Sequence, residues 1–153
     1  MKDLEFVAVS GGFDPVHWGH VKMIADAARY APVMVILNSD SWLMRKKGYV
    51  FMPWKERAYI LGNIKGVSVV SAVDDSDGTV CDAIKRHVPT YFANGGDRGR
   101  SNTPEQSVCE ELDVKLLWGI GGEEKIDSSS DLAKKARDFE VPPQRSTPIV
   151  SER

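Results

Sequence analysis

The sequence lacks any apolar run close to the ~20 residues that a membrane-spanning helix requires. It also lacks an excess of positive charge: 20 Lys and Arg stand against 22 Asp and Glu, which argues against a general DNA- or RNA-binding protein. The N-terminus has no apolar signal region, and two cysteines, Cys81 and Cys109, show no disulfide-framework spacing. We therefore expect a cytoplasmic protein with reduced thiols and no nucleic-acid or membrane partner.

Internal repeats and low-complexity segments are also absent, so the 153 residues are expected to form one domain with its own core. Residues 140–153 depart from this pattern, because their three prolines exclude a regular helix. We therefore predict a domain at 1–139 and a Pro-rich tail at 140–153. The tail is either an extended arm held against the body or a neighbour, or a frayed end.

Short apolar, β-branched runs alternate with helical patterns along the chain. Several runs are continuously apolar, as expected for strands of a sheet that is covered on both faces. The repeated order of strand and helix predicts a parallel sheet with right-handed crossovers. The expected strands are 6–9, 33–37, 67–73, 91–93 and 114–118, and the expected helices are 19–30, 53–63, 79–87, 104–112 and about 129–139.

The most informative segment is Gly-Gly-Phe-Asp-Pro-Val-His-Trp-Gly-His at residues 11–20, directly after the first expected strand. Gly11 and Gly12 allow a sharp turn, and the N-terminus of the next helix offers free amides to an anion. His17 and His20 are three residues apart, so on a helix they share a face. Their imidazoles could donate hydrogen bonds to a phosphoryl group as charge builds up on it.

Two alternative interpretations of the histidines need no phosphate. A zinc site built on His-x-x-His would need further ligands, and the remaining His87, Cys81 and Cys109 are not clustered in the sequence. A pair of histidines that only pack in the core would leave the preceding glycines unexplained.

The pattern Gly-x-Phe-Asp-x-x-His-x-Gly-His resembles the signature of the HxGH, or cytidylyltransferase-like, nucleotidyltransferase superfamily. That superfamily includes glycerol-3-phosphate cytidylyltransferase, phosphopantetheine adenylyltransferase and the heptose-phosphate adenylyltransferases. The resemblance covers about residues 6–137 and implies a Rossmann-like three-layer α/β/α sandwich with a five-stranded parallel sheet. The fixed positions are matched by Gly11 or Gly12, Phe13, Asp14, His17, Gly19 and His20. The resemblance implies that Gly11, Gly12, Phe13 and Asp14 contact the nucleotide or its phosphates.

The resemblance implies transfer of a nucleoside monophosphate from CTP or ATP to a phosphorylated small molecule, with release of pyrophosphate. Such an acceptor is largely a dianion at neutral pH and needs no general base, so catalysis consists of alignment and charge stabilisation. We expect His17 and His20 to donate to the α- and β-phosphoryl oxygens. Mg²⁺ is expected with the triphosphate and held mainly by it, since the sequence shows no carboxylate cage.

A cationic run, Arg45-Lys46-Lys47, follows the second expected strand on a predicted loop. A charge run is normally a solvated surface, but these cations could also hold phosphate oxygens. The order of the segment is similar to that in cytidylyltransferases, which implies that Lys46 is catalytic. Lys47, Arg57 and Asn38 are assigned to the acceptor.

The segment Gly95-Gly96-Asp97-Arg98 follows the fourth expected strand and could be no more than a tight turn. It resembles the Gly-Gly-Asp segment of heptose-phosphate adenylyltransferases, which lies beside the nucleotide. By that resemblance Gly95, Gly96 and Asp97 contact the base or ribose, and Arg98 a phosphate.

A serine run opens the last expected helix, and its serines could simply cap that helix. The resemblance implies that Ser128 and Ser129 contact the β- and γ-phosphates. Cytidylyltransferases tend to carry Arg-Thr-x-Gly just before this run, whereas this chain has Gly-Glu-Glu-Lys at 122–125. Lys125 would then supply the missing positive charge.

The main alternative function is a non-catalytic nucleotide-binding regulator with the same fold, which the missing arginine favours. Both motif histidines and Lys46 favour the enzyme. Among acceptors, a sugar or polyol phosphate is preferred, while the choice between CTP and ATP stays open. The family often forms dimers, and its domains can be fused to kinases, so a homodimer and a longer native chain both stay open.

Overall fold

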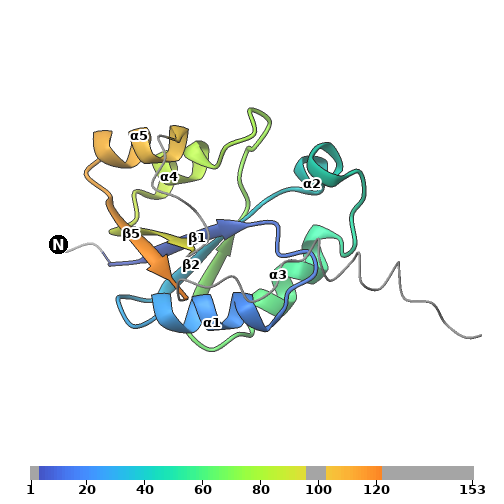
Figure 1. Cartoon of the computed structure of the whole chain (residues 1–153), viewed down its shortest axis with the longest axis horizontal. Coiled ribbons are helices and arrows are strands. Elements are labelled where there is room, and N and C mark those ends of the chain that lie inside the picture. Colours follow the sequence, from blue (N-terminus) through green and yellow to red (C-terminus); the bar gives the residue numbers. More distant parts are fainter. Residues whose placement is uncertain (1–3, 96–102, 122–153) are drawn as a thin grey trace, which may run out of the picture.

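The computed structural model describes residues 4–95 and 103–121, in which five parallel strands form one sheet with helices on both faces (Figure 1). Each strand pairs in parallel with its neighbours, as the strand-then-helix order predicts. In chain order the elements are β1 (Val7–Gly11), α1 (Trp18–Ala27), β2 (Val33–Leu37), α2 (Asp40–Lys47), α3 (Trp54–Gly62), β3 (Val67–Ser71), α4 (Cys81–His87), β4 (Tyr91–Gly95), α5 (Pro104–Glu111) and β5 (Lys115–Ile120).

The strand order is β3-β2-β1-β4-β5. The chain therefore adds β2 and β3 on one side of β1 and then returns to add β4 and β5 on the other side. Between β1 and β4 lies a topological switch point, and ligands of such sheets bind at the carboxyl ends of the strands there. The predicted Rossmann-like α/β/α fold is confirmed, and the motif at residues 11–20 lies at this edge.

Two apolar clusters fill the space between the sheet and its helices. Because side chains alternate along a strand, Val7 and Val9 of β1 join one cluster while Ala8 joins the other. The first cluster packs against α1 and α3, and the second against α4 and α5, so the two helix pairs lie on opposite sides of the sheet (Figure 1). All of β2 is buried, which explains its continuous apolar sequence.

The expected strands correspond to β1–β5, whereas α2 was predicted as a loop and that prediction is wrong. α2 begins where the Ser39 hydroxyl accepts a hydrogen bond from the Trp42 amide at 3.0 Å. It ends at Gly48, whose φ of 83° lies in the left-handed region that glycine tolerates. The sequence does not predict this helix, because Leu43 is its only buried residue and a single buried residue produces no helical apolar periodicity.

The remaining predictions for the C-terminal part concern residues beyond those described. The helix expected at about 129–139 and the tail at 140–153 both lie there, so the boundary at residue 139 stays a prediction. The helices of the described part run from seven to ten residues. None of these is long and apolar enough to cross a membrane.

Candidate active site

The two motif histidines cap the start of α1, and each accepts a hydrogen bond from a backbone amide there. His17 is the N-cap residue, and its Nδ1 accepts a hydrogen bond from the Gly19 amide at 3.1 Å. His20 returns the contact, because its Nδ1 accepts from the His17 amide at 3.1 Å. The result is a capping box with imidazoles in place of the usual hydroxyl and carboxylate. Since each Nδ1 acts as an acceptor, the proton of each neutral ring is on Nε2.

The His20 imidazole is held in its neutral form. Burial, followed by the proximity of His17, lowers the pKa of His20 to about 3. The two imidazoles stack with centroids 3.8 Å apart, and the Phe13 ring meets His20 edge-on at 4.6 Å. At neutral pH His20 is therefore an uncharged Nε2–H donor, suited to a hydrogen bond with a phosphoryl oxygen.

The turn that leads into α1 is strained and closely packed. Phe13 has a φ of 49°, a left-handed conformation that residues other than glycine seldom adopt. Its ring is 3% exposed, so burial in the core holds this conformation. Gly12 approaches α2 so closely that a Cβ atom there would lie 2.9 Å from the Leu43 side chain. Backbone strain that is held by packing is typical of functional sites.

Asp14 binds the protein's own chain. Its buried carboxylate accepts hydrogen bonds from the amides of Phe51 at 2.7 Å and Met52 at 2.5 Å. The Lys47 ammonium lies 3.3 Å from the same carboxylate and donates to the Asp14 carbonyl at 2.6 Å. The sequence predicted that Asp14 contacts the nucleotide. The structure makes its carboxylate the anchor of the segment between α2 and α3, and the nucleotide contact stays a prediction.

Lys46 and Lys47 lie in the last turn of α2 and differ in their surroundings. The Lys47 side chain is 13% exposed and packs over the Tyr49 ring at 4.7 Å, in addition to its contacts with Asp14. Lys46 is exposed, and its ammonium lies 5.0 Å from the centre of the Trp42 ring. No carboxylate among the described residues pairs with Lys46, whereas Lys47 is already neutralised. Of the two, Lys46 is the better placed to meet an anionic ligand.

Arg57 does not have the surface position that an acceptor contact requires. Its side chain is fully buried, and it donates to the carbonyls of Met52 at 2.8 Å, Gly12 at 2.8 Å and Asn38 at 2.9 Å. It also donates to the Asp40 carboxylate at 2.6 Å. Arg57 therefore braces the ends of β1 and β2 with four of its five N–H donors, and its role in acceptor binding stays a prediction that these contacts do not favour.

Asn38 is likewise buried, and its amide Nδ2 donates to Asp75 Oδ2 at 3.0 Å. Its predicted contact with the acceptor would have to compete with this bond. Asp75 was missed from the sequence, although its buried carboxylate holds both Asn38 and Ser39. The only sequence signal for Asp75 is its place after a strand, because polar loops show no periodic pattern.

Gly95 and Gly11 end two adjacent strands at the same edge of the sheet. The parallel pairing of Val7 with Tyr91 runs β1 and β4 in the same direction, so both strands end at this edge. The other predicted nucleotide-contacting residues lie outside the described ranges, and their roles stay predictions. They are Gly96, Asp97, Arg98, Lys125, Ser128 and Ser129.

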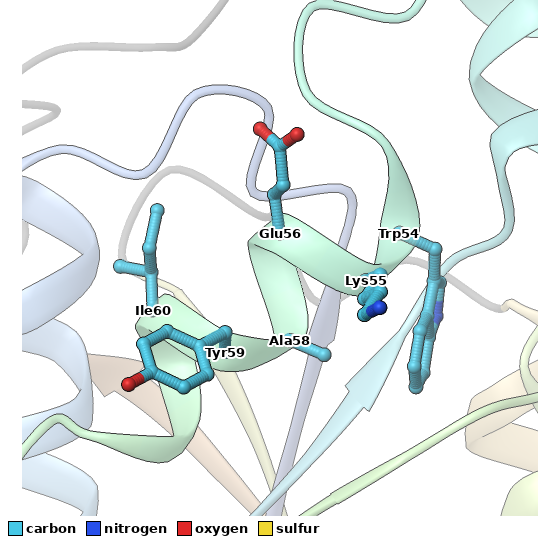
Figure 2. A pocket seen from close by; sticks show the side chains of 6 residues that line it. All are labelled: Trp54, Lys55, Glu56, Ala58, Tyr59 and Ile60. Atoms are coloured by element: carbon cyan, nitrogen blue, oxygen red, sulfur yellow. The ribbon is translucent and has the colours of Figure 1, made fainter.

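An apolar pocket of about 730 Å³ lies along α3 (Figure 2). Figure 2 shows the Glu56 carboxylate pointing away from the Trp54 ring, whose Nε1 donates to the Leu37 carbonyl at 3.2 Å. No predicted site residue belongs to the described lining of this pocket, so it is separate from the motif. That lining consists of Trp54, Lys55, Glu56, Ala58, Tyr59 and Ile60.

The fold and this site define an α/β protein of the Rossmann-like class, with a glycine-containing turn and two imidazoles at the switch point of its sheet. A family model described as Cytidylyltransferase-like matches residues 8–147, and the chain belongs to this family. The resemblance inferred from the motif is thereby confirmed, and with it a fold and family of nucleotidyltransferase type.

Relatives with curated names include the Bifunctional protein HldE of Aliarcobacter butzleri, 31% identical over 121 residues, and that of Sulfurimonas denitrificans, 35% identical over 119 residues. These alignments cover 77% and 76% of this chain but 25% and 24% of those proteins, so the chain spans about a quarter of their length. A lipopolysaccharide core biosynthesis protein from Thermoplasma volcanium has a similar fold, with a TM-score of 0.66 and 17% identity. That match covers 82% of this chain and 100% of the other.

Proposed function

We propose that this protein is a nucleotidyltransferase that moves a nucleoside monophosphate from CTP or ATP to a phosphorylated small molecule and releases pyrophosphate. The observation that carries the proposal is the capping box of His17 and His20, which directs both imidazole protons to Nε2 at the switch point. A sugar or polyol phosphate is the preferred acceptor. Its support is the likeness of Gly95-Gly96-Asp97 to the segment of heptose-phosphate adenylyltransferases.

In the proposed reaction an oxygen of the acceptor phosphate attacks the α-phosphorus, and the bond from that phosphorus to the bridging oxygen breaks. The electron pair leaves with pyrophosphate, and no proton has to be removed from the attacking dianion. The two Nε2–H groups donate to phosphoryl oxygens on which charge accumulates. Lys46 adds a positive charge for the acceptor phosphate or the α-phosphate.

Mg²⁺ is proposed only as the companion of the triphosphate. Across residues 4–95 and 103–121, no group of three or more His, Cys, Asp or Glu side chains is arranged to hold a metal ion. We therefore propose that the triphosphate, and not a cage of side chains among these residues, holds the ion. The steps above depend on the chain's own donors.

The test is pyrophosphate release from CTP and from ATP with sugar phosphates, glycerol phosphate and pantetheine phosphate as acceptors. His17→Asn and His20→Gln are the variants of choice, because Asn is a good N-cap and Gln is the usual partner in a capping box. Each should lower turnover by about 100-fold to 1,000-fold while the melting temperature is retained.

Two outcomes contradict the proposal in different ways. Unchanged turnover in both histidine variants would show that the imidazoles do not stabilise the transferred phosphoryl group. Nucleotide binding without pyrophosphate release on any acceptor would favour the non-catalytic nucleotide-binding regulator.

A further inference from the structure

The position of α2 depends on polar contacts more than on apolar packing. The helix has eight residues, and Leu43 is the only one that is buried. A helix of two turns is not stable alone, so its place must come from tertiary contacts. This matters for the site because Lys46, the exposed cation whose ammonium lies over the Trp42 ring, is in its last turn, and the Trp42 ring lies against Gly12 of the motif.

Asp75, which follows β3, makes three contacts that hold the start of α2, beside the bond from Arg57 to Asp40. Its carboxylate accepts from the Ser39 amide at 2.8 Å, the Ser39 hydroxyl at 2.7 Å and the Asn38 amide nitrogen at 3.0 Å. Because the Ser39 hydroxyl gives its proton to Asp75, its lone pairs face the Trp42 amide, which it caps at 3.0 Å. Asp75 therefore sets the orientation of the N-cap of this helix.

The same residue also contacts the other end of α2. The Arg45 guanidinium donates to the Asp75 carbonyl at 2.7 Å and lies 4.0 Å from its carboxylate. Trp42, whose amide is capped, carries the ring over which the Lys46 ammonium lies. A continuous series of contacts thus leads from Asp75 through Ser39 and Trp42 to Lys46.

We propose that Asp75 is a positioning residue: it holds α2 in the orientation that directs the Lys46 ammonium to the site. The expected effect of Asp75 on catalysis rests on the proposed function, whereas the placement of α2 by Asp75 does not. Asp75 bonds Asn38, a predicted acceptor contact, but it reaches Lys46 only through the helix. Its negative charge near the N-terminus of α2 adds a favourable interaction with the helix dipole.

Two readouts on the full chain test the proposal with Asp75→Asn. This variant keeps the size of the side chain but replaces one of its two acceptor oxygens by an NH2 donor, which then faces the donors of Ser39 or Asn38. The first is hydrogen exchange, in which amides 42–48 should exchange about 10-fold faster while those of β1 and β2 stay unchanged. The matched control is Asp74→Asn, since Asp74 is exposed and its carboxylate accepts from the amide and hydroxyl of the nearby Ser76, while its own amide donates to the Asp82 carboxylate. Ser39→Ala replaces Asp75→Asn if the latter does not fold.

The second readout is a double-mutant cycle on kcat/KM with Lys46→Ala. Asp75→Asn should lower kcat/KM by roughly 10-fold to 100-fold in the wild-type background, as expected for a misplaced group. In the Lys46→Ala background the further loss should be about 3-fold or less, because the group that Asp75 positions is gone. A residue that only supports folding would lower kcat/KM equally in both backgrounds.

The outcomes separate this proposal from the proposed function. If the wild-type chain transfers no nucleotide, the proposed function fails, and hydrogen exchange in α2 alone decides the role of Asp75. Exchange in Asp75→Asn that matches the Asp74→Asn control overturns the proposal. Multiplying losses in the double-mutant cycle overturn it as well.

Discussion

Replacing Arg57 by methionine should remove a large part of the stability of this protein. Methionine keeps the apolar stem of the side chain but none of the four hydrogen bonds that the guanidinium makes. Three carbonyls, of Gly12, Asn38 and Met52, lose their donor in a largely buried environment. Each such loss costs about 1 kcal/mol or more. Asp40 contributes less, because its side chain is 46% exposed and water can replace the lost bond.

The expected loss in the free energy of unfolding is therefore about 3 kcal/mol, within reach of the values seen when one partner of a buried pair is removed. For an m value of about 1.5 kcal/mol per molar urea, the midpoint of unfolding should fall by about 2 M. Arg57→Lys should lose about half as much, since one ammonium cannot reach acceptors on three segments. The assay is equilibrium urea unfolding followed by tryptophan fluorescence.

Arg86→Met is the matched control. Arg86 also pairs with a carboxylate, that of Asp82 at 3.1 Å, but its side chain is 48% exposed. Its loss should change stability by about 0.5 kcal/mol or less. The reasoning is refuted if Arg57→Met unfolds within about 1 kcal/mol of the wild type and instead raises KM for the phosphorylated acceptor. That result would restore the acceptor contact predicted from the sequence.

Three further predictions concern the groups around the motif. The pKa of His20 is about 3 in the folded chain and near 6.5 in the unfolded chain. Between these pH values the unfolded chain binds more protons, so the free energy of unfolding decreases as the pH falls from about 6.5 to 3. Urea unfolding at several pH values should show a shallower slope for His20→Gln, by up to about 1.4 kcal/mol per pH unit, and an equal slope would contradict the assignment. Lys46→Ala should lower kcat/KM with little change in melting temperature, whereas Lys47→Ala should lower the melting temperature. If the two variants change kcat/KM and melting temperature by equal amounts, the two lysines do not have separate roles. Asp14→Asn should destabilise by about 2 kcal/mol in urea, because a buried acceptor of two amides loses its charge, and nucleotide affinity that falls without this loss would point to a ligand contact instead.

The parts of this protein that could be predicted from sequence are those determined by short-range pattern. Continuous apolar runs mark β1 and β2, because both faces of the sheet are covered. The glycines and histidines at 11–20 mark the motif, because the turn and the helix start need those residue types in that order. The Thr103 hydroxyl caps α5 by accepting from the Gln106 amide at 3.1 Å, a contact within three residues of the kind that local sequence determines.

The roles of the buried polar residues could not be predicted in this way. Arg57, Asp14 and Lys47 are charged, and in the sequence each has the character of a ligand-binding group. Only the fold shows that the Arg57 guanidinium and the Asp14 carboxylate bind backbone groups brought together from distant segments. Asp75 and the helix α2 were missed for the same reason, since their contacts join residues 36 positions apart.

From the sequence alone one could predict a parallel sheet, a sharp glycine turn after its first strand and two imidazoles on the first turn of the following helix. These follow from local rules of backbone geometry and apolar burial. The tertiary structure decided which charges remain available to a ligand. Of the adjacent lysines it neutralises Lys47 with Asp14 and leaves Lys46 exposed. The physical reason is that a buried charge must find a partner within the fold, and which partner it finds depends on how distant segments pack.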